Sequence, residues 1–168
     1  LSKTPGVTVS NMSSTKALRD ITEAKGESYF ASAVGEVNVV KLMKEKSAVI
    51  GGEGNGGIIY PELHYGRDAL VGVALLLSYL SETDKSLSEL KKSYPSYTIT
   101  KNKIQLTPEI NTDALLEQVK KEFKEYEIDT TDGVKINFDD EWVHLRKTNT
   151  EPIIRLYAES SNAEKAHE

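Results

Sequence analysis

Strand-like and helix-like segments alternate along the first half of the chain, and this order constrains the fold more than any other feature. Short β-branched or apolar runs at 7–11, 28–34 and 48–53 are separated by segments with helical spacing at 15–26 and 36–46. Strands that are joined through helices lie parallel, because the crossover returns the chain to the same end of the sheet. We therefore predict an α/β unit with a mainly parallel sheet and covered faces.

Polar residues mark the expected starts of the helices. Ser13 and Ser14 are N-cap candidates for the first helix, and Asp68 is the candidate for the apolar segment 69–80. That segment is too short for a membrane-spanning helix, which needs roughly 20 residues. We predict that it forms a buried helix, and we expect the preceding residues, 54–66, to form a loop.

The order of elements changes after Leu80. The next stretch, 81–96, is polar, rich in Ser and Lys, and typical of a linker or a short hinge helix. Beyond it the pattern predicts one or two strands at 97–106, an amphipathic helix at 112–126, and hairpins that turn at Asp132–Gly133 and Asp139–Asp140.

This change of order predicts three parts. We expect an α/β domain at 1–84, a hinge at 85–96, and a smaller α+β domain with a mainly antiparallel sheet at 97–168.

Composition disfavours several classes of protein. The chain is 38% hydrophobic and 28% charged, which is the balance of a folded globular protein. Its net charge of −5 at pH 7 disfavours binding to a nucleic acid, and we expect no nucleic-acid or membrane partner. Because the chain has no cysteine and its three histidines lack ligand spacing, we expect no metal site. Without a signal-like start, a cytoplasmic location is expected.

A glycine-rich loop, GGEGNGG at 51–57, follows the third predicted strand. Glycines let the backbone turn sharply and approach a ligand, while Glu53 and Asn55 place a carboxylate and an amide at alternate positions. Such groups can hold neighbouring sugar hydroxyls. The spacing does not match the nucleotide-binding glycine loops, and a flexible connection between elements is the alternative interpretation.

A second polar loop, RKTNTEPIIR at 146–155, lies between two strand-like stretches. Arg146 and Arg155 can present planar charge to an oxyanion. Hydroxyl, amide and backbone donors are added by Thr148, Asn149 and Thr150. This donor set suits a phosphate, and a β-turn with solvated charges is the alternative.

Together the two loops resemble those of the α-D-phosphohexomutase family, which includes phosphoglucomutases, phosphomannomutases and phosphoglucosamine mutases. GGEGNGG is similar to the family's sugar-recognition loop, and RKTNTEP is similar to its phosphate loop, R-x-S/T-N/G-T-E/T-P. VGEVNVV at 34–40 and YGRDAL at 65–70 also match in order and spacing. The resemblance covers nearly the whole chain, as most of the third and most of the fourth of four domains.

The resemblance implies roles for the loop residues. Glu53 and Asn55 would bind the sugar hydroxyls. The phosphate that is not being transferred would be held by Arg146, Thr148, Asn149 and Thr150, with Arg155 beside them. Family members commonly carry a histidine where Gly57 stands here. The change to glycine affects one contact to the sugar. The accessory candidates at this contact are Gly57, His64 and Arg67.

The same resemblance implies an enzyme that moves phosphate between C6 and C1 of a hexose through a bisphosphate intermediate. The family's phosphoserine loop, T-A/G-S-H-N/F-P, and its metal loop, D-x-D-x-D-R, do not occur in these 168 residues. We therefore expect no catalytic residue, cofactor or activity in this chain alone, and Mg²⁺ in the parent enzyme. The expected partners are a phosphorylated hexose and the N-terminal domains of the parent chain, and a non-catalytic sugar-phosphate-binding module is the alternative.

Overall fold

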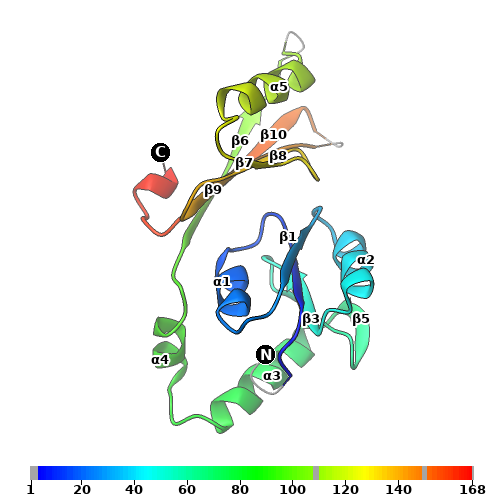
Figure 1. Cartoon of the computed structure of the whole chain (residues 1–168), viewed down its shortest axis with the longest axis vertical. Coiled ribbons are helices and arrows are strands. Elements are labelled where there is room, and N and C mark those ends of the chain that lie inside the picture. Colours follow the sequence, from blue (N-terminus) through cyan, green and yellow to red (C-terminus); the bar gives the residue numbers. More distant parts are fainter. Residues whose placement is uncertain (1–3, 108–109, 149–150, 168) are drawn as a thin grey trace. The chain divides into compact units, whose positions relative to one another are not determined.

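The structure, a computed structural model, describes residues 4–107, 110–148 and 151–167. The chain divides into two compact units, Leu1–Ser96 and Tyr97–Glu168, and each has its own five-stranded sheet (Figure 1). The predicted fold classes are confirmed, since an α/β unit is followed by an α+β unit with an antiparallel sheet.

The first unit is built on a sheet with the strand order β2-β1-β3-β4-β5. Its strands are β1 (Thr8–Asn11), β2 (Tyr29–Ser32), β3 (Ile50–Glu53), β4 (Gly57–Tyr60) and β5 (His64–Arg67). The first three are parallel, as predicted, and β4 and β5 extend the sheet as antiparallel strands. The helices of this unit are α1 (Ala17–Glu23), α2 (Glu36–Lys46), α3 (Ala69–Ser81) and α4 (Leu87–Lys92).

Two helical crossovers arrange the parallel strands. α1 joins β1 to β2, and α2 then carries the chain back past β1 to β3. Because such crossovers are right-handed, the two helices lie on opposite faces of the sheet, as Figure 1 shows. Buried apolar side chains form one cluster between α2 and the sheet: Val9, Val39, Met43, Ala48 and Ile59. Because β1, β2 and β3 are parallel, their carboxyl ends lie at the same edge of the sheet, where open α/β sheets commonly bind ligands.

The prediction of a loop at 54–66 is wrong, because this stretch contains β4 and β5. The chain reverses in a tight turn after Glu53. Gly56 adopts a φ of 93°, which favours glycine, and its N–H donates to the carbonyl of Glu53 at 3.1 Å. Glycines occur both in flexible loops and in hairpin turns, so their number alone did not separate the two.

The predicted caps have different outcomes. Asp68 caps α3 as expected, because its side chain accepts a hydrogen bond from the backbone N–H of Val71 at 3.0 Å. Ser13 and Ser14 are not caps of α1, since that helix follows Lys16, which makes no side-chain capping bond. The Ser14 hydroxyl instead accepts a hydrogen bond from the backbone N–H of Gly54, in the turn after β3.

α3 is less buried than its apolar sequence predicted. The helix packs against β4, where an added Cβ on Gly72 would lie 3.0 Å from the Ile58 side chain. None of its residues is buried, and Leu70 and Leu77 are 81% and 59% exposed. An apolar run indicates that a helix needs a covering surface, but it does not identify that surface. In the described part of the chain, no helix is both long and apolar enough to cross a membrane.

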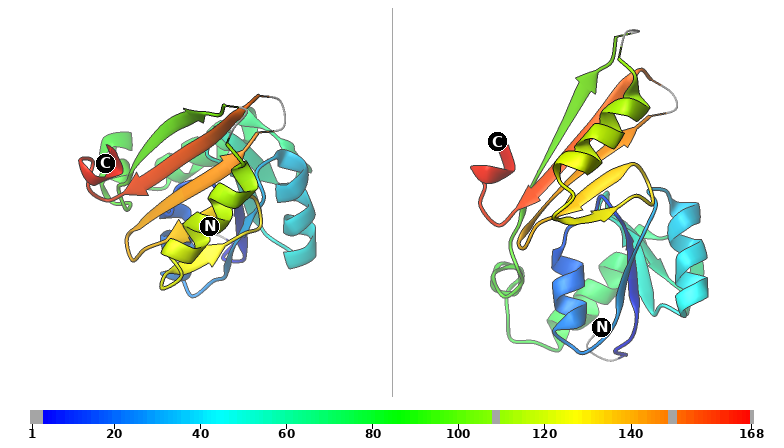
Figure 2. Two further views of the ribbon diagram at one scale, coloured as in Figure 1. Left: turned by 90° about the horizontal axis from the view of Figure 1, so that it is seen from above. Right: turned by 45° about the horizontal axis from the view of Figure 1, so that its top comes forward.

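The second unit contains an antiparallel sheet with the order β6-β10-β9-β8-β7. Its elements are β6 (Thr98–Gln105), α5 (Thr112–Glu122), β7 (Glu127–Asp129), β8 (Val134–Asn137), β9 (Glu141–Lys147), β10 (Ile153–Ser160) and the 3₁₀ helix η1 (Lys165–His167). Figure 2 shows β6 and β10 (green and orange-red) side by side, in agreement with their eight-residue register. Both predicted hairpin turns are present, and β6 is a single strand.

His144 of β9 anchors the turn at Asp132–Gly133. The side chain is buried, and its Nε2–H donates to the backbone carbonyl of Asp132 at 2.6 Å. Burial disfavours the charged ring and lowers the pKa of His144 below its ordinary value, although the bond to the Asp132 carbonyl opposes this shift. The folded unit therefore favours a neutral His144.

We expect the free energy of unfolding of the second unit to fall on acidification. The ring in the unfolded chain takes up a proton near its ordinary pKa of about 6.5, whereas the folded ring resists until a lower pH, so protons favour the unfolded chain. The stability is fully present above about pH 6.5 and is lost as the pH falls toward the folded pKa. Urea titrations at about pH 7.5 and about pH 5.5 that follow Trp142 fluorescence would measure this loss. His144→Gln should show a smaller pH dependence, and an undiminished one would contradict the assignment to His144.

We propose that residues 85–96 act as a hinge between domains at 1–84 and 97–168. Every residue of this stretch except Leu90 is exposed, and the boundary along the chain between the two compact units falls directly after Ser96. Trypsin should therefore cut first at Lys85, Lys91 or Lys92, because a protease needs a locally accessible backbone. Two lysines of β6 serve as internal controls: Lys101 and Lys103.

Mass spectrometry of the early fragments identifies the first cut. Both control lysines are exposed, but they lie in a strand that is paired with β10, so they should resist while the hinge is cleaved. A first cut within either sheet would show that the boundary is misplaced.

Candidate functional site

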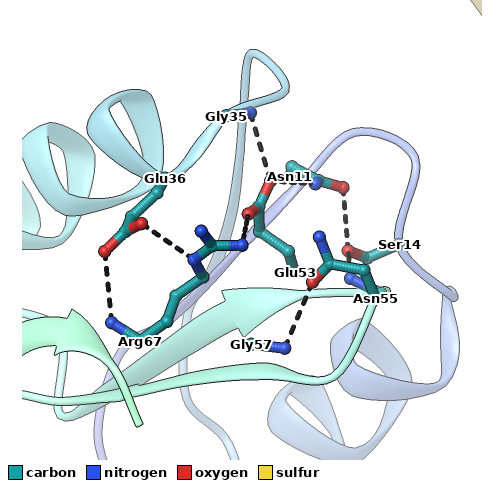
Figure 3. A network of polar contacts seen from close by, with 9 residues as sticks. Asn11, Ser14, Gly35, Glu36, Glu53, Asn55, Gly57 and Arg67 are labelled. Atoms are coloured by element: carbon teal, nitrogen blue, oxygen red, sulfur yellow. Dashed lines mark hydrogen bonds and ion pairs between the residues drawn. The ribbon is translucent and has the colours of Figure 1, made fainter.

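The carboxylate of Glu53 lies at the carboxyl end of β3, beside the end of β1. Ser10 pairs with Gly52 in the parallel register, so the following residues, Asn11 and Glu53, are neighbours at the same edge of the sheet. Oε1 of Glu53 accepts hydrogen bonds from Nδ2 of Asn11 at 2.8 Å and from the N–H of Gly35 at 3.2 Å (Figure 3). The side chain is only 5% exposed, so its position is fixed by these two donors.

Arg67 links Glu53 to a second carboxylate. Its Nη1 lies 3.8 Å from Oε2 of Glu53, and its Nε lies 2.8 Å from Oε2 of Glu36 at the start of α2. The backbone N–H of Arg67 also donates to Glu36 at 3.1 Å. These backbone and side-chain bonds hold the pKa of Glu36 below its usual value. Arg67 thus lies at the centre of the polar network in Figure 3.

An open cavity of about 510 Å³ adjoins this network, within the ~300–1,000 Å³ range of small-molecule sites. Its lining residues are Glu36, Asn55, Gly56, Gly57, Arg67 and Ala69. Oδ1 of Asn55 accepts a hydrogen bond from the N–H of Gly57 at 3.2 Å, and its Nδ2 has no hydrogen-bond partner within the described residues. The cavity therefore presents an amide donor beside a guanidinium and a carboxylate.

Glycine at position 57 makes room for Arg67. A Cβ on Gly57 would lie 2.6 Å from Cδ of Arg67, which is closer than any real Cβ contact. A larger residue at 57 and the present position of Arg67 are therefore incompatible. His64, the other accessory candidate, does not line the cavity, and its Nε2 lies 3.1 Å from Oδ2 of Asp68.

In the second unit, three basic residues form a row across neighbouring strands. Arg146 of β9 pairs directly with Arg155 of β10, which pairs on its other side with Lys103 of β6. Directly opposite residues in antiparallel strands project from the same face, with Cβ atoms ~4.5–5.5 Å apart. Like charges in such positions repel one another, so the row favours a bound anion. Lys103 was not among the residues predicted from the sequence, because a local pattern does not show which strand pairs with β10.

The three cations differ in their partners. Nε of Arg146 lies 2.9 Å from Oδ2 of Asp132, whereas Nη1 of Arg155 reaches only the hydroxyl of Tyr157, at 3.5 Å. Across residues 4–107, 110–148 and 151–167, no carboxylate forms an ion pair with Arg155 or Lys103. Arg155 and Lys103 are therefore more weakly neutralised than Arg146, which lies at the other end of the row.

The turn that carries Asp132 is pressed against β9. Gly133 has a φ of 86°, and a Cβ at this position would lie 2.2 Å from the carbonyl oxygen of Leu145. Only glycine allows both the left-handed conformation and this close approach. The turn therefore places the Asp132 carboxylate beside Arg146.

Thr148 begins the turn between β9 and β10. Its hydroxyl donates to the carbonyl of Glu151 at 2.6 Å and accepts from the N–H of the same residue at 3.2 Å. Two further phosphate-binding candidates, Asn149 and Thr150, lie outside the described residues. Among the residues that the structure does describe, no cluster of three or more His, Asp or Glu side chains could hold a metal ion.

Each of the two units matches a described protein domain. Residues 1–97 match the family described as phosphoglucomutase/phosphomannomutase, alpha/beta/alpha domain III. Residues 100–168 match the family described as phosphoglucomutase/phosphomannomutase, C-terminal domain.

Individual relatives agree with these matches. A phosphoglucomutase/phosphomannomutase of Thermococcus kodakarensis is 38% identical over 165 residues, which are 97% of this chain and 36% of the relative. A phosphoglucosamine/phosphogalactosamine mutase of Sulfurisphaera tokodaii is 34% identical over 131 residues, which are 77% of this chain and 29% of the relative. This chain thus spans about a third of the length of these relatives.

Solved structures show the same fold. The crystal structure of a phosphoglucomutase/phosphomannomutase family protein from Burkholderia thailandensis aligns with a TM-score of 0.80 at 24% identity. The alignment covers 99% of this chain and 36% of that protein. Since both halves of the sequence match successive domains of one family, the chain belongs to the phosphoglucomutase/phosphomannomutase family.

Proposed function

We propose that this chain recognises the substrate for a phosphohexomutase, an enzyme that interconverts hexose 6-phosphate and hexose 1-phosphate through a bisphosphate intermediate. Glu53 and Asn55 bind the sugar hydroxyls. The phosphate that is not transferred is held by Arg146, Thr148, Asn149 and Thr150, with Arg155 beside them. The observation that carries the proposal is the row of Arg146, Arg155 and Lys103 across three strands.

A phosphate group suits this row electrostatically. It carries about 1.5 to 2 negative charges near neutral pH and offers three strong acceptor oxygens. Guanidinium groups bind such oxygens through planar, charge-assisted hydrogen bonds, each of which contributes roughly 1.5–3 kcal/mol. Since the whole chain carries a charge of −5, the attraction is local to this row. We add Lys103 to the phosphate-binding candidates.

The groups at the first cavity suit a sugar. A hydroxyl both donates and accepts, so it can bond to the Oε2 atom of Glu53 and to the Nδ2 atom of Asn55. Arg67 lies between Glu53 and Glu36 and lines the same cavity, so its guanidinium can donate to a further hydroxyl. The names of the relatives include glucose, mannose, glucosamine and galactosamine phosphates, so the proposal names hexose phosphates as a class.

The proposal assigns substrate binding to this chain and the transfer chemistry to a longer parent protein. Members of this family are generally Mg²⁺-dependent, and we propose that Mg²⁺ and the reacting serine belong to N-terminal domains of that parent. The residues described here offer no fitting ligand cluster, so we assign no step through the metal to them. We also propose a cytoplasmic location for the parent protein.

Arg146→Ala should weaken the binding of glucose 1-phosphate and glucose 6-phosphate about tenfold to a hundredfold, because it removes charge-assisted bonds of roughly 1.5–3 kcal/mol. Both ligands should be affected, since each presents a phosphate to the same loop. NMR titration of the 168-residue chain measures both dissociation constants.

Arg19→Ala is the matched control. This guanidinium of α1 pairs with Glu23 at 2.9 Å and is not among the residues proposed to bind the sugar or the phosphate, so its removal should leave both affinities unchanged. If Arg146→Ala bound both ligands as well as the control, RKTNTEPIIR would be a solvated turn and the phosphate role would be lost.

A further inference from the structure

We propose that Asn11 and Ser14 are positioning residues that hold the Glu53 carboxylate and the following glycine turn in their ligand-binding geometry. This inference rests on the proposed sugar-binding role of Glu53. Neither residue lines the cavity, and both are almost fully buried, with exposures of 5% for Asn11 and 6% for Ser14. They act through Glu53 and Gly54.

Asn11 determines which oxygen of Glu53 is available. Its Nδ2 donates to Oε1 at 2.8 Å, and the N–H of Gly35 donates to the same oxygen at 3.2 Å. Oε1 is therefore occupied by protein donors. Oε2 points toward Arg67, whose Nη1 lies 3.8 Å away, beyond ordinary hydrogen-bond length. The acceptor that a sugar hydroxyl can use is thus Oε2.

The orientation of the Asn11 amide is itself fixed. Its Oδ1 accepts hydrogen bonds from the N–H of Ser13 at 3.1 Å and from the hydroxyl of Ser14 at 2.9 Å. Since both partners donate, the oxygen must face them, and the NH₂ group must face Glu53. The chain turn after β1 therefore aims the donor at the carboxylate.

Ser14 extends this arrangement to the glycine turn. Its hydroxyl donates to Asn11 and accepts from the N–H of Gly54 at 2.8 Å. A Cβ on Gly54 would lie 3.2 Å from Cα of Ser14, so the two backbones are in close contact. The residue after Glu53 is thus attached to the segment that follows β1. Fully bonded buried networks of this kind are rigid, and losing one member leaves the others unsatisfied.

Asn11→Asp tests the contact with little change of shape. The aspartate keeps an oxygen for Ser13 and Ser14, but it replaces the donor to Glu53 with a second carboxylate oxygen, which repels the first. We expect glucose 1-phosphate to bind about tenfold more weakly or worse in NMR titrations. The affinity for inorganic phosphate should not change, because that ion needs only the cationic row.

Ser10→Ala is the matched control for this variant. Ser10 is the preceding residue of β1 and is also buried. Its hydroxyl bonds to the Tyr29 hydroxyl at 2.8 Å and donates a long bond of 3.4 Å to the backbone carbonyl of Asn11, but it makes no bond to the Asn11 side chain or to Glu53. This variant should bind both ligands as the unmodified chain does. A general weakening of the sheet would instead affect both variants.

Ser14 provides a second pair of variants if Asn11→Asp does not fold. Ser14→Ala removes the acceptor for Gly54 and should weaken glucose 1-phosphate binding without changing phosphate binding. Ser14→Thr keeps the hydroxyl and should restore the affinity. Amide hydrogen exchange gives a ligand-free readout: exchange should be faster at Gly35 in Asn11→Asp and at Gly54 in Ser14→Ala.

These readouts separate this inference from the proposed function. If the unmodified chain binds glucose 1-phosphate no better than inorganic phosphate, the sugar-binding role fails, and faster exchange at Gly35 and Gly54 still supports the positioning of Glu53. If both variants bind glucose 1-phosphate normally and exchange at both glycines is unchanged, the positioning role is overturned.

Discussion

Parallel pairing of β1 with β3 is the constraint on which the candidate sugar site depends. It places Asn11 and Glu53 side by side at one edge, where the N–H of Gly35 at the start of α2 reaches the same carboxylate. A carboxylate that is 5% exposed needs such donors, because burial without them is strongly unfavourable. The strands and α2 of the α/β unit thus fix the Glu53 carboxylate, whose Oε2 atom faces Arg67.

The antiparallel sheet of the second unit creates its site through register. The pairing of β9, β10 and β6 places Arg146, Arg155 and Lys103 opposite one another. Asp132 neutralises one end of this row, and the left-handed Gly133 allows the turn that holds Asp132 to approach β9. One unit therefore presents an amide, a guanidinium and carboxylates that suit hydroxyls, and the other presents a row of cations that suits a phosphate.

The sequence was informative where the determining interactions are local. Hydrophobic spacing located β1 to β3 and α2, and Asp68 marked the start of α3. The composition of the two loops indicated Glu53 and Arg146, whose binding roles stay predictions. It failed where the partner lies far along the chain. Ser14 had the local signature of a helix cap, yet it bonds Gly54, 40 residues away. Lys103 and Asp132 joined the candidate site only through strand pairing. The glycine-rich stretch 51–57 was expected to lead into a loop, but it forms the end of β3, a tight turn and the start of β4.

The most direct test of the account is a crystal structure of the chain with glucose 1-phosphate bound. The account predicts phosphate oxygens within about 3 Å of the Arg146 guanidinium, on the face that it shares with Arg155. It would be contradicted by a phosphate bound elsewhere while Arg146 contacts only Asp132.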